Sequence, residues 1–186
     1  MPDLYTNSPD DKNLEHGHFM THPAELDEKQ LRSQTEVRFQ RRSGPGGQHR
    51  NKVETAVILL HCPTQISAEA NERRSQKENL DVATFRLRIE LAIQIRTSRS
   101  ATNAPSTLWK SRLSGSRIRV SPEHADFPSL LAEALDWLAQ LDWDAQKAAE
   151  QLGCSVSQFV KLLKLAPKAL QQLNQHRQQL GKPPLR

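Results

Sequence analysis

Residues 43–57 read SGPGGQHRNKVETAV, and this stretch carries most of the information on what the chain does. Gly46 and Gly47 are adjacent, so the backbone there can take dihedral angles that other residues avoid, and no side chain holds a reacting group away from the main chain. The flanking residues are basic, namely Arg41, Arg42, Arg50 and Lys52. The stretch therefore predicts a loop that lies among phosphates and brings a backbone N–H close to a reacting carbonyl.

Apolar residues around this loop follow the periods of strands and of one helix. Residues 36–41 and 66–70 alternate between apolar and polar side chains, and residues 56–61 form a short apolar run, so we expect three strands. Residues 51–56 have the length of one or two helical turns. From residue 76 to 95 apolar side chains recur at spacings of three and four, which predicts a helix with one apolar face.

The expected fold class is α+β, with four regions along the chain. Residues 1–30 form an acidic flexible arm, in which a short helix is possible from Ala24 to Leu31. Residues 31–96 form a β-(short α)-β-β-α domain that carries the glycine-rich loop. Residues 97–122 are a basic linker, and residues 123–186 form a small all-helical module of four helices.

Charge is distributed unevenly along these regions. The net charge is +5, yet residues 31–120 hold 17 Lys and Arg against seven Asp and Glu, whereas residues 1–30 hold two against seven. A strongly basic middle segment indicates a polyanionic partner, since neutralised phosphates supply most of the sequence-independent affinity for nucleic acid. A basic surface that is merely solvated is the alternative.

The order of three motifs points to a known family. SGPGGQHRNKVETAV, HCPT at residues 61–64 and NERRSQKEN at residues 71–79 together resemble the catalytic domain of class I peptide release factors and of the small ribosome-rescue hydrolases related to them. The resemblance covers roughly residues 36–95. It departs from the family at Arg50, where an apolar residue is frequent, and at Gln65, where a glycine usually follows Pro-Thr.

The resemblance implies a role for each loop residue. In that family the GGQ loop enters the peptidyl transferase centre of the large ribosomal subunit, so Gly46, Gly47 and Gln48 are expected to be catalytic. Asn51 and Thr55 are expected to brace the loop. Contact with rRNA is expected from the basic residues of the domain and of the linker: Arg41, Arg42, Arg50, Lys52, Arg73, Arg74, Arg96, Arg99, Lys110, Arg112, Arg117 and Arg119.

The implied function is ribosome-dependent hydrolysis of the peptidyl-tRNA ester. A chain of 186 residues has no room for a codon-reading domain, so we expect codon-independent rescue of stalled ribosomes. The partners would be the ribosome and peptidyl-tRNA, and the chain would be a monomer off the ribosome. The alternative is a non-catalytic protein that uses the same basic domain only to bind the ribosome or RNA.

Other chemistry is not indicated. Cys62 and Cys154 are isolated, so we expect core thiols rather than a disulfide or a zinc site, and no metal or cofactor. His49, His61 and Glu54 form no recognisable triad. His61 at a strand end is more simply a structural histidine, and Glu54 a salt-bridge partner of Lys52 or Arg50. The lack of a signal region or of a membrane-spanning apolar run predicts a cytoplasmic location.

The last third of the chain contains a weaker signal. Ala149, Gly153 and Phe159 have the spacing of a helix-turn-helix, although residues 121–186 hold seven basic and seven acidic residues. We expect a packing module of helices. Docking to RNA or to a ribosomal protein is the second possibility, and sequence-specific binding of DNA is the third.

Overall fold

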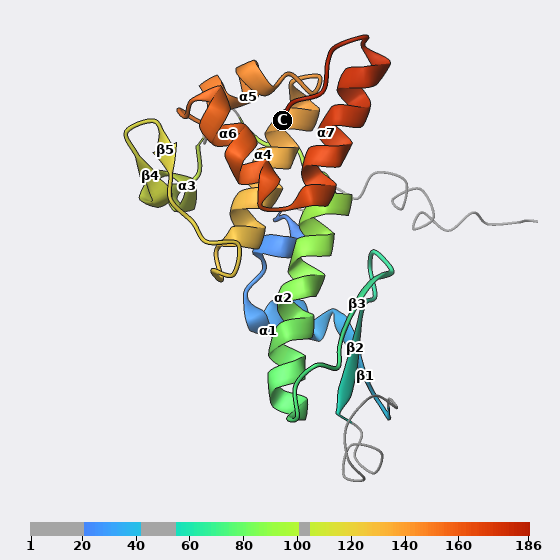
Figure 1. Ribbon diagram of the computed structural model, residues 1–186. Coiled ribbons are helices and arrows are strands. Elements are labelled where there is room, and N and C mark those ends of the chain that lie inside the picture. Colours follow the sequence, from blue (N-terminus) through green and yellow to red (C-terminus); the bar gives the residue numbers. More distant parts are fainter. Residues whose placement is uncertain (1–20, 42–54, 101–104) are drawn as a thin grey trace, which may run out of the picture.

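The computed structural model describes residues 21–41, 55–100 and 105–186. It is an α+β protein, as expected, with a small sheet and several helices (Figure 1). The long helix α2 (Gln76–Gln94) packs against the sheet along its N-terminal part and against the helical module at its other end. The sheet and the helical module thus both pack on α2.

The sheet has three antiparallel strands in the order β1-β2-β3. They are β1 (Thr35–Gln40), β2 (Ala56–His61) and β3 (Ile66–Ala70), which match the expected strands to within one residue. Gln65, in the turn between β2 and β3, has a φ of 56°. This left-handed conformation favours glycine, the residue that the resemblance leads us to expect at position 65. The Gln65 Nε2 donates to the main-chain oxygen of Cys62 at 2.7 Å within the same turn.

Helix α2 covers one face of the sheet because its apolar residues recur every four positions. Ala83, Leu87 and Leu91 are completely buried. Ser75 caps the helix by accepting a hydrogen bond from the Glu78 backbone N–H. The helix lies where its periodicity predicts it.

The segment before β1 is a 3₁₀ turn followed by a helix, rather than the single helix expected from Ala24 to Leu31. The turn η2 covers Pro23–Glu25, and α1 covers Glu28–Ser33. The break falls at Asp27, whose carboxylate accepts from the Gln30 N–H in a capping box and starts α1 there. Leu31 is buried in the core, so this segment is part of the fold.

The segment expected to be a basic linker contains regular structure. It forms α3 (Thr107–Arg112) and a hairpin of β4 (Leu113–Ser114) and β5 (Arg117–Ile118). Trp109 is completely buried, and its Nε1 donates to the Leu152 oxygen at 2.9 Å. One aromatic residue therefore attaches α3 to the helical module, which the charge pattern of the segment did not indicate.

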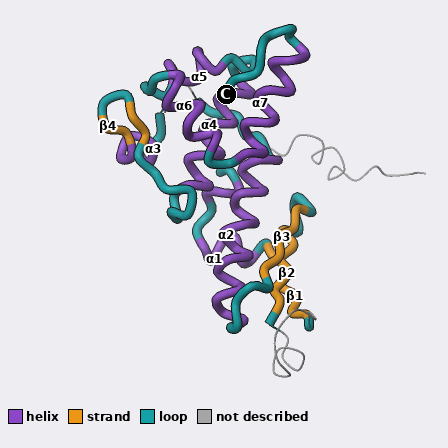
Figure 2. The backbone as a smooth tube through the Cα atoms, viewed as in Figure 1, coloured by secondary structure: helices purple, strands orange, loops and turns teal. Residues whose placement is uncertain are grey.

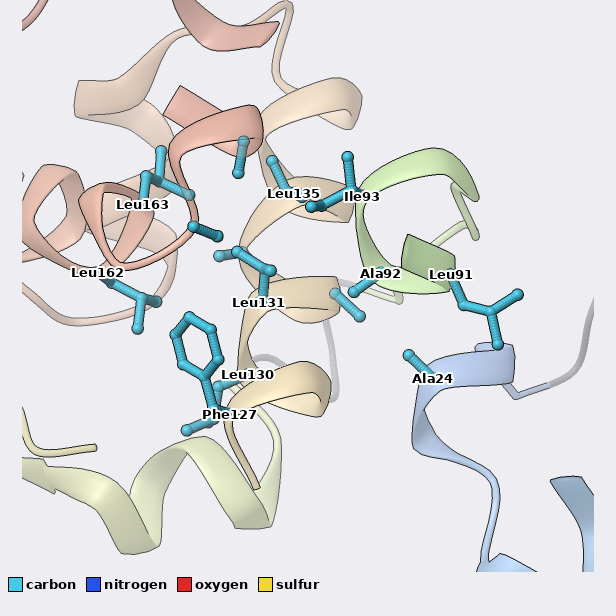
Figure 3. Close-up of a cluster of buried hydrophobic side chains, with 14 of the residues drawn as sticks. Ala24, Leu91, Ala92, Ile93, Phe127, Leu130, Leu131, Leu135, Leu162 and Leu163 are labelled. Atoms are coloured by element: carbon cyan, nitrogen blue, oxygen red, sulfur yellow. The ribbon is translucent and has the colours of Figure 1, made fainter. Parts of the chain in front are cut away.

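The helical module contains the four expected helices, α4 (Phe127–Gln140), α5 (Ala145–Gln151), α6 (Val156–Lys164) and α7 (Pro167–Gln179) (Figure 2). Asp144 caps α5, and Ser155 caps α6. The core shown in Figure 3 combines leucines of α4 and α6 with Ala92 and Ile93 of α2. Because α2 also covers the sheet, the module packs on the same helix as the strands do.

Candidate active site

The two ends of the glycine-rich loop leave and re-enter the sheet at the same place. Gln40, the last residue of β1, is paired with Ala56, the first residue of β2. Gly46, Gly47 and Gln48, in the connection between them, lie outside the described residues. So do the other residues predicted to act or pack there, which are Arg42, His49, Arg50, Asn51, Lys52 and Glu54.

The start of β2 is tied to the turn before α2 by the side chain of Asn79. Its Nδ2 donates to the main-chain oxygens of Thr55, at 2.7 Å, and of Arg73, at 3.0 Å. Its Oδ1 accepts from the Arg73 N–H at 2.9 Å. Asn79 itself is completely buried, so the polar groups of its amide depend on these three hydrogen bonds. One amide thus fixes the end of the loop against the turn that carries Arg73.

Sequence reasoning gave Asn79 no role, although the residue belongs to the NERRSQKEN motif. The available signal was its position four residues before Ala83 and eight before Leu87, on the apolar face of α2. A polar side chain on such a face has to find partners inside the protein. The backbone at Thr55, which was expected to brace the loop, is one of those partners.

Three of the predicted RNA-binding arginines border this end of the sheet. Arg41 follows β1, and Arg73 and Arg74 lie in the turn before α2; all three are exposed. The adjacent carboxylate of Glu72 pairs with Arg86 at 2.6 Å, and Arg86 also donates to the Glu69 oxygen. The Glu72 carboxylate is thus paired with a residue of α2. The exposed arginines at this end of the sheet suit contact with a polyanion.

His61 is a structural histidine, as predicted. It is completely buried, and its ring nitrogens lie 2.7 Å from Thr64 Oγ1 and 3.1 Å from Gln34 Oε1. Burial lowers the pKa of the imidazole below its usual value, which favours the neutral form. Both nitrogens are engaged, so His61 is not available as a general base.

The two cysteines differ, and the expectation that both are core thiols is wrong for one of them. Cys154 is buried, and burial raises the pKa of its thiol to about 11. Cys62 is exposed because it follows β2 in a turn on the surface. In the described part of the chain no group of three or more His, Cys, Asp or Glu could hold a metal ion.

The six basic residues of residues 96–119 separate into two groups. Arg99 pairs with Glu25 at 2.5 Å and with the buried Asp136 at 2.9 Å. Arg96 donates to main-chain oxygens at the end of α2 and to Gln172 of α7, and Arg112 pairs with Asp126. These three side chains hold the described parts of the protein together. The exposed ones are Lys110, Arg117 and Arg119.

Arg99 occupies a polar junction between three segments of the chain. Asp136 also accepts from the Thr97 N–H and hydroxyl, and Glu133 accepts from Ser106 in the same way. The buried carboxylates of α4 thus attach the chain on both sides of residues 101–104.

No described helix is both long and apolar enough to span a membrane.

Comparison with known proteins finds a family model and relatives for part of the chain. The model of the RF-1 domain matches residues 24–124, more than half of the 186 residues. Peptide chain release factor 1 of Streptococcus agalactiae is 44% identical over 68 residues, which cover 37% of this chain and 18% of the relative.

Two further relatives carry similar names. Peptide chain release factor 2 of Acidovorax sp. is 53% identical over 51 residues, covering 27% of this chain and 14% of the relative. The chloroplastic peptide chain release factor PrfB1 of Arabidopsis thaliana is 43% identical over 58 residues, covering 31% and 13%. The chain thus spans less than a fifth of the length of the curated relatives it matches.

Proposed function

Since the chain belongs to the RF-1 domain family, the class I release-factor GGQ domain, we propose that it promotes hydrolysis of the peptidyl-tRNA ester on the ribosome. The observation that carries the proposal is the arrangement at the end of the sheet. Paired Gln40 and Ala56 anchor the GGQ-bearing connection, Asn79 fixes its end, and exposed arginines border it. The names of the matching relatives support the same reaction.

In the proposed reaction water adds to the ester carbonyl and the tRNA 3′ oxygen leaves with a proton. The backbone N–H of Gln48 donates to the oxyanion that develops, and its side-chain amide positions the water. A fixed donor of this kind lowers the barrier by about 2.7–4 kcal/mol. Gly46 and Gly47 provide the backbone geometry, while Arg41, Arg73 and Arg74 contact rRNA.

We further propose that release does not require a stop codon. In the described part of the chain no tripeptide of the codon-reading type lies between two strands. The described residues after the family match, 125–186, are helical and pack on α2 and on one another. Rescue of stalled ribosomes is therefore the context in which this chain would act.

Replacing Gln48 tests the proposal against a purely binding role. We expect Gln48→Ala to lose most release of peptide from ribosomes whose decoding site lacks mRNA, while ribosome affinity stays the same. Gln175→Ala, an exposed change on α7, serves as the matched control. If the unaltered protein binds such ribosomes and releases no peptide, the non-catalytic alternative holds. Release that appears only with a stop codon in the decoding site would contradict rescue.

A further inference from the structure

The helix-turn-helix spacing of residues 149–159 is present as a structure. Helices α5 and α6 are joined by residues 152–155, in which Gly153 has a φ of +66°. Ala149 and Phe159 are buried, at 1% and 0% exposure, as the small residue and the apolar anchor of such a motif should be. The second helix therefore presents its opposite face to solvent.

The helical module has no net charge, but its acidic and basic residues lie in different parts of its sequence. All seven acidic residues of residues 121–186 precede Gln151, and the six Lys and Arg that follow it have no acidic residue among them. Two of the seven, Glu133 and Asp136, are buried at the junction, and Asp126 pairs with Arg112. The surface after α5 is consequently more basic than the sequence total suggests.

The exposed face of α6 continues onto the β4–β5 hairpin. Ser157, Lys161 and Lys164 are exposed along α6. At the start of the helix the Ser155 N–H donates to the Ser116 oxygen in the hairpin turn at 3.2 Å, and β5 packs against α6. Arg117 lies on β5 and Arg119 directly follows this strand, and both residues are exposed. The four cations on this surface are Arg117, Arg119, Lys161 and Lys164. Within the described residues none of them takes part in a salt bridge, and all four are exposed.

We infer that α6 and the β4–β5 hairpin form a second nucleic-acid-binding surface, which holds the phosphate backbone of duplex RNA. The choice of RNA rests on the proposed function, which places the chain on the ribosome. The surface itself rests on unpaired cations in two adjacent elements. Lysine and serine side chains suit phosphate, because they contact it as a point charge and as a hydroxyl donor.

The composition of α6 disfavours reading of DNA bases. A recognition helix reads base edges in the major groove through side chains near its N-terminus, where Asn, Gln and Arg give the specific pairings. The first three residues of α6 are Val156, Ser157 and Gln158, so only Gln158, which is half-buried, is of that type. The major groove of A-form RNA is too deep and narrow for side chains to read, so α6 would lie along the backbone instead. Binding should therefore depend on charge and not on sequence.

The test uses the full chain with both lysines of α6 changed. We expect Lys161→Gln/Lys164→Gln to bind a short mixed-sequence RNA duplex about tenfold more weakly, and to reduce the slope of log affinity against log salt by about 1–2. Lys29→Gln/Lys182→Gln removes the same charge from α1 and from beyond α7, and should leave both quantities unchanged. Lys161→Arg/Lys164→Arg keeps the charge and should keep the binding.

Two results would overturn the inference. One is RNA affinity that is equal in the α6 variant and in the control, with unfolding midpoints that show both proteins folded. The other is tighter binding to a B-form DNA duplex than to the RNA duplex at the same salt. Peptide release at saturating protein is measured in parallel. Loss of RNA binding with full release at saturation supports the surface, whereas absence of release in the unaltered protein contradicts the proposed function and leaves the binding result standing.

Discussion

The side chain of Asn79 on α2 donates a 2.7 Å hydrogen bond to the main-chain oxygen of Thr55, 24 residues earlier in the chain. Thr55 directly precedes β2, where the connection that carries Gly46–Gln48 re-enters the sheet. The same amide binds both main-chain polar groups of Arg73. The helix that covers the sheet therefore also sets the position of the loop end relative to the arginines.

Replacing Asn79 should affect both stability and hydrolysis. Asn79→Ala removes three part-buried hydrogen bonds to the main chain of Thr55 and Arg73, so we expect the free energy of unfolding to fall by about 1–3 kcal/mol. The rate of release at saturating protein should fall as well, because the loop end is no longer fixed. Urea unfolding and single-turnover release measure the two effects. A variant that is destabilised yet releases peptide at the original rate would show that Asn79 serves the fold alone.

Gly47→Ala should abolish hydrolysis and leave folding and ribosome affinity nearly unchanged. A methyl group there restricts the backbone and blocks the close approach of the ester. The control is Gly181→Ala, since a Cβ at Gly181 would meet no atom within 4 Å. That change should cost only some stability, because Gly181 has a φ of +66°. Undiminished release by the Gly47→Ala protein would contradict the catalytic assignment.

Periodic segments were predictable from the sequence, and side-chain pairings were not. Strands at residues 56–61 and 66–70 and the long helix after Ser75 follow from apolar spacing alone. The role of Asn79 depends on which backbone groups lie opposite it after the sheet and helix have packed. No local pattern in the sequence carries that information.

Residues 96–122 show the same limit for charge. Six cations without an acidic residue predicted a basic linker, yet the partners of Arg99 and Arg112 are carboxylates from other segments, Glu25, Asp136 and Asp126. Trp109, in the same segment, is completely buried. A count of charges within one segment does not include ion pairs formed between segments.

Acid should destabilise the protein through His22. The buried ring accepts from the Ala24 N–H at Nδ1 and lies 3.2 Å from the Ile95 oxygen at Nε2, which fits the neutral form. Burial, with the charges of Arg99 and Arg96, lowers the pKa of His22 from 6.5 to about 4. As the pH falls, His22 is therefore protonated in the unfolded chain before it is protonated in the folded protein. The contribution of His22 to the free energy of unfolding is complete above pH 6.5. About 3 kcal/mol of it is lost as the pH falls to about 4.

A comparison with His22→Gln isolates this effect. Burial raises the pKa of Glu25, so that carboxyl contributes in the opposite direction, with stability lost as the pH rises through its folded pKa. Subtracting the unfolding free energies of the variant from those of the unaltered protein, pH by pH, cancels Glu25 and leaves His22. The difference should shrink between pH 6.5 and 4. A difference that does not vary with pH would contradict a neutral buried His22.

Hydrolysis should require the ribosome. His61 lies at the end of β2 that is away from the loop, and it has both ring nitrogens engaged and a lowered pKa. Among the described residues none is placed to act as a general base at the loop, so we expect the ribosome to supply the position of the substrate. We expect free peptidyl-tRNA to be hydrolysed at close to its spontaneous rate, measured against the same substrate bound to ribosomes. Rapid hydrolysis without ribosomes would contradict this dependence.

The two groups of cations in residues 96–119 should respond differently to substitution. Lys110, Arg117 and Arg119 are exposed, so replacing all three with Gln should leave the unfolding temperature nearly unchanged. Ribosome affinity should fall, and the slope of log affinity against log salt should decrease by about 2–3, because that slope scales with the number of neutralised phosphates. Release at saturating protein should survive, since none of the three lies at the loop.

Arg99→Gln tests the other group. Its side chain pairs with Asp136, whose own side chain is completely buried, so its loss leaves an uncompensated charge inside the protein. Breaking a buried pair in this way costs about 3–5 kcal/mol. We expect a clearly lower unfolding temperature and, below it, the original salt slope for ribosome binding. A reduced slope in the Arg99→Gln protein would mean that Arg99 exchanges Asp136 for phosphate on the ribosome. An unchanged slope in the triple variant would mean that the hairpin and α3 do not contact rRNA, which leaves the helical module, with the lysines of α6, and the arginines beside the loop as anchors.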